Sequence, residues 1–474
     1  MLSGKTVADQ PAVGARLPLN EKKNANFNRE RFRIDPIIVF LNGSKACRRA
    51  SILVSIVCGL NCCMSDSVHA EDTRRIGIDD SLAFTQKPID YHGSETADPV
   101  AVFQKRLDSK QVKLHHHEHF GFLLSVLHAL HVPLETQVLV YSKTARNPRL
   151  VRPKTPRAIF FNDDVAVGWV PGATELEVVG IDSVKGGMFY TLSQTTADDG
   201  SDHRFERSSR CLSCHRGNTT HHVPGLIVRS FVTDRIGKPI SGFSRVTHDM
   251  DLSKRFGGWY VTGKPSGQKH RGNLIDKADI ARHKRDPSHR GTLEDLQPLF
   301  DVSRYPSPHS DIVAQLVLQH QAHGQNLLMR VGYESRLGRR SDAEDRLIRY
   351  LLFLDEAPLA EPVRGTSGFA EWFEKQKPFE HNCYGVHAHR SLRQFDLETR
   401  LFKFRFSYLV YSRLFDGLPE EVRNRLYKRI WTALNGNDDS LDLETFPKSE
   451  RRAIIEIVRA TKCNLPDYWR DDLH

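Results

Sequence analysis

Two cysteines and a histidine near the middle of the chain have the spacing of a covalent haem site. Residues 211–215 read Cys-Leu-Ser-Cys-His, and Cys-x-x-Cys-His is the attachment pattern of c-type haem. In that chemistry Cys211 and Cys214 form thioethers to the two haem vinyl groups, and His215 is the proximal iron ligand. We therefore predict one covalently bound haem c.

Two other kinds of site use cysteines at this spacing. A zinc site needs a second pair of ligands, and the sequence has no second Cys-x-x-Cys, although His221 and His222 are close to the first. A thioredoxin-type dithiol expects a strand before it and a helix after it, whereas polar, turn-rich residues flank this motif. Haem is favoured, and a zinc site or a pair of redox or structural thiols remain alternatives.

The second axial ligand of a haem decides between electron transfer and reaction with small molecules. Met250 follows the motif at a separation compatible with a small cytochrome c core, but its neighbours are polar. His320 and His323 lie on an expected helix over 311–328, on one face with apolar residues such as Leu316. A histidine in that setting is more often a core residue than a ligand. Another residue of the chain or an open position are the remaining alternatives.

The first 70 residues have the features of an export leader. Basic residues between 45 and 49 precede 51–64, an apolar stretch of secretory length, and Val68 and Ala70 are small residues at the −3 and −1 positions. We predict cleavage after Ala70 and a periplasmic or otherwise exported protein, a setting compatible with covalent haem attachment and with disulfides. The alternative for 51–64 is a buried hydrophobic helix.

Composition and cysteine usage limit the partners of the mature chain. The protein is 39% hydrophobic and 27% charged, as in soluble globular proteins, and no apolar run approaches the roughly 18 residues that span a membrane. No basic tract is interleaved with aromatic residues, so we expect no nucleic acid. Outside the leader and the motif the cysteines are Cys383 and Cys463, which form one disulfide or stay free.

The sequence predicts an α+β protein. Short β-prone runs between 137 and 193 are bounded by turn residues, and no helix-length segment separates them, so an antiparallel meander is expected. From 291 onward the apolar spacing is helical, including a long aromatic helix at 398–415. We predict a β-rich domain at 71–200, a loop-rich, cytochrome c-like haem segment at 201–290 and a helical domain at 291–474.

Several stretches together resemble an uncharacterised bacterial family of large secreted proteins that carry a single c-type cytochrome motif. They include RCLSCHRG (210–217), VPGLIVRS (223–230), GGWYVTG (257–263) and TRLFKFRFSYLVYSRLFDGLP (399–419). The resemblance covers nearly all of 85–470 and implies haem binding at the motif, without a substrate. Its members tend to carry Met after a His before Gly-Asn, where this chain has Arg271, so a family-wide Met ligand is not expected here.

The function that these observations favour is an exported monohaem c-type cytochrome that passes electrons to a partner protein. A haem-dependent periplasmic oxidoreductase, peroxidase-like and with an open distal site, is the first alternative, because the chain is far longer than one haem requires. A zinc-stabilised secreted binding protein is the second. No pattern identifies catalytic residues, the redox partner or an oligomeric state.

Overall fold

The computed structural model describes the chain after its N-terminal part. The described residues are 82–93, 95–195, 203–376, 390–436, 438, 440–441, 443 and 445–470. By its contacts the chain divides into 1–75 and 76–474, and every described residue belongs to the second unit. The predicted leader and its cleavage after Ala70 lie outside the described residues, as does Cys383. No helix in the described part is long and apolar enough to cross a membrane.

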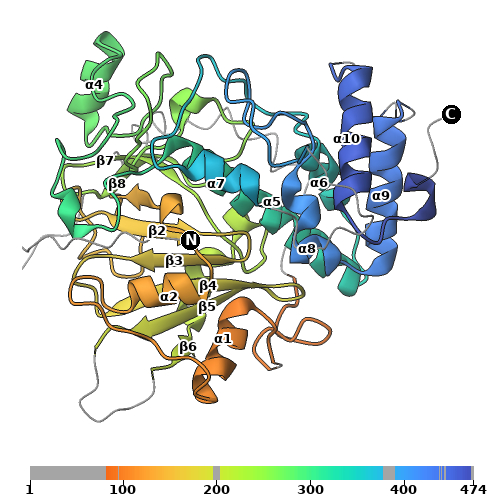
Figure 1. Cartoon of the computed structure of the whole chain (residues 1–474), viewed down its shortest axis with the longest axis horizontal. Coiled ribbons are helices and arrows are strands. Elements are labelled where there is room, and N and C mark those ends of the chain that lie inside the picture. The colour runs from red at the N-terminus through yellow and green to blue at the C-terminus, as the bar shows by residue number, and fades with distance from the viewer. Residues whose placement is uncertain are drawn as a thin grey trace, which may run out of the picture. The chain divides into compact units, whose positions relative to one another are not determined.

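A six-stranded antiparallel sheet dominates the N-terminal half of the described chain (Figure 1). Its strands follow one another in sequence order: β1 (Val138–Val140), β2 (Arg157–Phe161), β3 (Val165–Trp169), β4 (Glu175–Asp182), β5 (Gly186–Ser193) and β6 (Phe205–Arg207). Val178 of β4 pairs with Val167 of β3 and Tyr190 of β5. The predicted meander is confirmed, because connections without a crossover helix join consecutive strands antiparallel.

Helices α1 (Pro99–Asp108) and α2 (Leu123–Ala129) cover one face of this sheet. Figure 1 shows α2 in front of the strands. Alternate strand residues, among them Phe160 and Val178, point to this face and share a buried cluster with Phe103 and Leu127 of the two helices. The first core of the molecule therefore lies between the sheet and this helical layer.

The long helix α5 (Ile312–Arg336) contributes to the core on the opposite side of the sheet and is buried along most of its 25 residues. Phe161 and Ile181 of the sheet belong to one buried cluster with Val317 and Leu328 of α5. The helices that follow are α6 (Ala343–Leu351), α7 (Phe369–Lys375), α8 (Arg413–Asp416), α9 (Glu420–Leu434) and α10 (Lys448–Thr461). The described chain is thus α+β, with most of its helices in the C-terminal part.

The prediction of a long aromatic helix at 398–415 is wrong. This stretch is mostly irregular, and its regular structure is the 3₁₀ turn Tyr408–Tyr411 followed by the short α8. Its aromatic rings pack toward different neighbours: Phe402 lies 5.7 Å from Phe353 and 6.0 Å from Phe373, measured between ring centroids. The aromatic density reflects burial inside the core and not one face of a helix.

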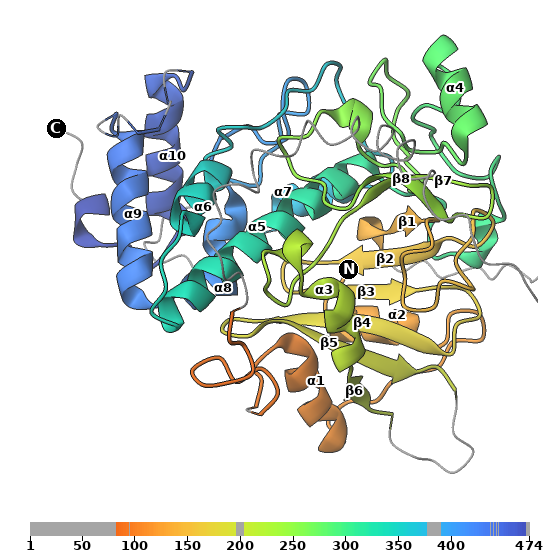
Figure 2. The same cartoon turned by 180° about the vertical axis from the view of Figure 1, so that it is seen from behind.

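Short elements occupy the region that carries the Cys-x-x-Cys-His motif. They are α3 (Leu212–His215), the antiparallel hairpin β7 (Ser230–Thr233) and β8 (Pro239–Phe243), and α4 (Lys277–Arg285). Figure 2, seen from behind, shows α3 over strands β3 and β4, on the side away from α2. The motif therefore lies on the sheet face that α1 and α2 leave uncovered, and the domain boundaries at 200 and 290 remain predictions.

Candidate haem-attachment site

The two cysteines of the motif are available for covalent chemistry. Cys211 ends a 3₁₀ turn, and Cys214 lies in α3, which follows at once. Both thiols are free, with Cys214 exposed and Cys211 partly exposed. Burial raises the pKa of the Cys211 thiol above its ordinary value, so this thiol is protonated at neutral pH. Two reduced thiols one helical turn apart, with one open to solvent, fit attachment to a large ligand.

The imidazole of His215 is held in the form that binds a metal. Its Nδ1 lies 2.8 Å from the carbonyl oxygen of Gly225, and a carbonyl only accepts, so Nδ1 carries the proton. Nε2 therefore keeps its lone pair, and such a hydrogen bond is the usual support of a metal-bound histidine. Burial lowers the pKa of His215 to about 4, so the ring is neutral at pH 7.

The turn after the motif brings Gly225 under the ring. His221 and His222 both have left-handed backbone angles, φ 54° and 60°, which are uncommon for residues with a side chain. The chain thereby reverses, and the amide of Gly225 donates to the carbonyl of His215 over 2.9 Å. Gly225 thus contacts His215 twice, through its amide to the backbone and through its carbonyl to the ring.

An asparagine of the long helix fixes this turn from the other side. Asn326 of α5 accepts from the amide of Leu226 and donates to its carbonyl, over 3.2 and 2.8 Å. A Cβ on Gly225 would lie closer than 3.0 Å to Oδ1 of Asn326, a separation that Cβ atoms essentially never have. Glycine is therefore required there because the helix side chain approaches the backbone closely. Sequence analysis missed Asn326, and the Pro224-Gly225 turn was the only local signal.

The sheet forms the surface beneath the motif. The ring of Phe189 in β5 lies 4.8 Å from the ring of His215, between centroids, and the carbonyl of Phe189 accepts from the amide of Ser208 over 2.8 Å. Next to this contact the uncovered sheet face carries the ion pair Arg157–Glu177. Besides burial and its bond to Gly225, the charges of Arg157 and Glu177 also shift the pKa of His215, so the pair lies within electrostatic reach of the motif.

The structure places the predicted distal ligands in the helical core. Nε2 of His320 lies 2.7 Å from the hydroxyl of Ser407, and burial lowers the pKa of His320 to about 3. The ring of His323 lies 5.2 Å from that of His221, between centroids, and Met250 packs at the edge of the same core cluster. Among the described residues, the recorded side-chain contacts of His215 are with Gly225 and Phe189, so the second axial ligand stays a prediction.

Two further sequence expectations concern positions away from the motif. His270, which precedes Arg271, uses both ring nitrogens: Nε2 lies 2.9 Å from the Thr292 hydroxyl, and Nδ1 accepts from the amide of Gly272. It is a core residue that holds its own loop. Cys463 is disulfide-bonded, while its predicted partner Cys383 lies outside the described residues, so that pairing remains a prediction.

Within the part of the chain that the structure describes, no group of three or more His, Cys, Asp or Glu side chains is arranged to hold a metal ion. Comparison of the chain with protein-family models, with characterised proteins and with solved structures finds no match.

Proposed function

We propose that the protein is an exported monohaem c-type cytochrome that exchanges electrons with a partner protein. The observation that carries the proposal is the state of His215. Its ring is neutral, its Nδ1 proton is bound to the Gly225 carbonyl, and its Nε2 lone pair is free for iron, directly after two free thiols. A proximal haem ligand needs a neutral ring of fixed orientation with an available Nε2, placed directly after the cysteine pair, and His215 meets each of these needs.

Different residues of the chain bind and orient the proposed haem. Cys211 and Cys214 anchor the porphyrin by thioethers, His215 supplies the proximal nitrogen, and Gly225 fixes the orientation and tautomer of that ring. The bound haem supplies one-electron exchange. The predicted segment 201–290, whose described residues form short elements and irregular backbone, is then the haem segment. Export through the predicted leader brings the thiols to a compartment compatible with attachment.

One observation favours the second candidate, a haem-dependent oxidoreductase with an open distal position. His320 has a hydrogen-bond partner of its own in the helical core, and the Arg157–Glu177 pair, which lines a cavity, is within electrostatic reach of His215. Polar, partly enclosed surroundings of this kind suit an exchangeable ligand better than a fixed thioether or imidazole. Cyanide binding to the oxidised protein separates the candidates, because two strong protein ligands resist displacement.

The experiment that tests the proposal is expression with the native leader in bacteria that carry c-type maturation machinery. We expect haem to migrate with the polypeptide on a denaturing gel, in the wild type and in the control variant His128→Ala, which changes an exposed residue of α2. The double variant Cys211→Ser/Cys214→Ser should keep its fold and lose the bound haem. Haem that leaves the wild-type chain on denaturation would contradict the proposal.

A further inference from the structure

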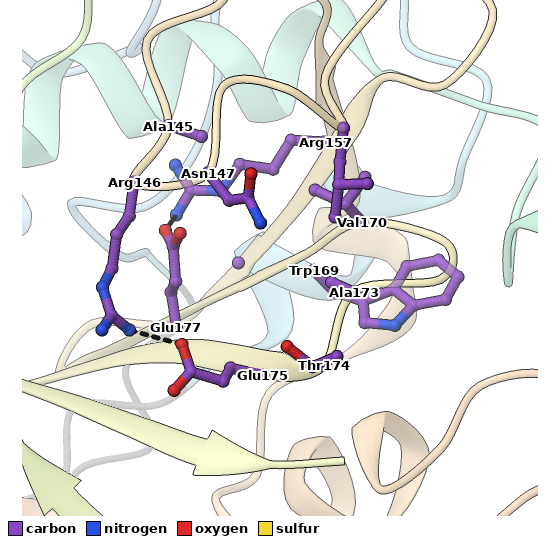
Figure 3. Close-up of a pocket in the computed structure, with 12 residues that line it drawn as sticks. Ala145, Arg146, Asn147, Arg157, Trp169, Val170, Ala173, Thr174, Glu175 and Glu177 are labelled. Atoms are coloured by element: carbon purple, nitrogen blue, oxygen red, sulfur yellow. Dashed lines mark hydrogen bonds and ion pairs between the residues drawn. The ribbon is translucent and has the colours of Figure 1, made fainter. Parts of the chain in front are cut away.

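A cavity of about 210 Å³ opens on the side of the sheet opposite α1 and α2. Its walls come from the loop 145–150 and from strands β2, β3 and β4, as Figure 3 shows. The charges of Glu177, Arg146 and Arg157, which line it, add to burial and a Ser208 hydrogen bond in setting the pKa of the Cys211 thiol. The charged residues of the cavity are thus within electrostatic reach of the first cysteine.

The charges in the cavity cancel. Arg146 pairs with Glu175 over 2.5 Å, and Arg157 pairs with Glu177, and no other charged residue lines the cavity among those described. The second pair is the more buried, with about a fifth of Arg157 and a quarter of Glu177 exposed. A ligand of either charge would leave an uncompensated charge in a partly desolvated site, which is unfavourable. For the same reason the two haem carboxylates do not fit here.

Hydrogen-bonding capacity remains after the ion pairs are formed. A guanidinium has five N–H donors and a carboxylate about four acceptor sites, and the recorded ion pairs use only part of them. Asn147 and Thr174 add a side-chain amide and a hydroxyl to the walls. Gly168 lets the Arg157 guanidinium lie close against β3, because a Cβ there would collide with it. Donors and acceptors of several residues therefore line one cavity.

We propose that this cavity binds a small uncharged molecule that both donates and accepts hydrogen bonds, held chiefly by the Arg157–Glu177 pair. The volume equals several water molecules at about 30 Å³ each, so the ligand has a few heavy atoms up to about the size of a small amide or diol. The position of the ligand near a haem rests on the proposed function. Binding of the ligand in the cavity does not rest on it.

The test uses three isosteric probes that differ in charge: acetamide, acetate and acetamidinium. Binding to the full mature protein is measured by saturation-transfer NMR, with haem content read separately from the same sample. We expect acetamide to bind at least about tenfold more tightly than either charged probe. Arg157→Met should weaken the binding of acetamide about tenfold. Arg349→Met, which breaks the exposed pair with Asp355, should leave the affinity for acetamide unchanged.

A second variant should reverse the preference between acetamide and acetate, a result that loss of the fold could not produce. Glu177→Gln keeps an acceptor beside Arg157 but gives the cavity a net positive charge, so acetate should overtake acetamide. Equal binding of the three probes, no binding of acetamide, or an unchanged preference in Glu177→Gln would each overturn the proposal. Absence of covalent haem from a sample that still binds acetamide would instead remove the proposed function and leave the binding site intact. In haem-loaded protein, acetamide should also shift the main haem absorption band, and saturation without a shift would refute the placement beside haem.

Discussion

Substituting Gly225 by alanine tests how the turn after the motif supports His215. The added Cβ collides with Oδ1 of Asn326, which is itself buried. Overpacking of this kind costs about 1–3 kcal/mol of unfolding free energy. Gly217→Ala is the matched control in the same loop, because its φ of −159° is ordinary extended backbone and a Cβ there meets nothing within 4 Å. It should cost less than about 0.5 kcal/mol.

A double-mutant cycle with Asn326 separates the collision from other effects. Asn326→Ala removes the two hydrogen bonds to the backbone of Leu226, at about 1 kcal/mol each. With the asparagine gone, the alanine at 225 has room, so the double variant should be more stable than the sum of the singles by about 1–2 kcal/mol. Urea unfolding of the haem-free protein measures all four states.

The same variant has a readout at the proposed haem. Movement of Gly225 would take away the acceptor of the His215 Nδ1 proton, so the imidazole would be a weaker donor to iron and the oxidised state would be less stabilised. We therefore expect the midpoint potential to rise in Gly225→Ala and to stay unchanged in Gly217→Ala. Gly225→Ala with wild-type stability, additive energies in the cycle, or an unchanged potential would refute the reasoning.

Two further predictions concern pH and buried charge. Burial lowers the pKa of His215 to about 4 and of His320 to about 3, so near pH 6.5 the unfolded chain takes up protons that the folded chain does not. The haem-free protein should therefore have its full stability above that pH and lose stability toward pH 4. Urea titrations at several pH values will show this loss, which should be less steep in His320→Gln. The buried Arg393 pairs with Asp163, whose side chain is about a quarter exposed, so Arg393→Met should cost about 1.5–3 kcal/mol through the lost charged hydrogen bond. Arg364→Met, at an exposed pair, should cost less than about 1 kcal/mol, and thermal unfolding at equal pH compares the two.

Local sequence patterns predicted the sheet because its information is local. Each β-prone run ends at turn residues, and the strands pair with their immediate neighbours in sequence. The helix prediction for 398–415 failed for the opposite reason, because the structure of this stretch depends on distant segments. Its aromatic residues contact distant segments, as Phe402 contacts Phe353 and Phe373, and a helical spacing cannot distinguish that burial from one face of a helix.

The residues of the candidate site show the same contrast between local and long-range information. Cys211, Cys214 and His215 were found because attachment chemistry requires them at fixed spacing. The residues that support them come from elsewhere: Asn326 reaches the turn from α5, and Arg157 and Glu177 come together only through the pairing of β2, β3 and β4. No spacing in the sequence encodes these approaches, because they depend on how the sheet and α5 pack around the motif.

The most direct measurement is the mass of the proteolytic peptide that contains residues 211–215, taken from protein matured in an exporting host. The account predicts this peptide with the added mass of one haem and no free thiol at either cysteine. The same peptide recovered unmodified, with Cys211 and Cys214 both open to alkylation, would contradict it.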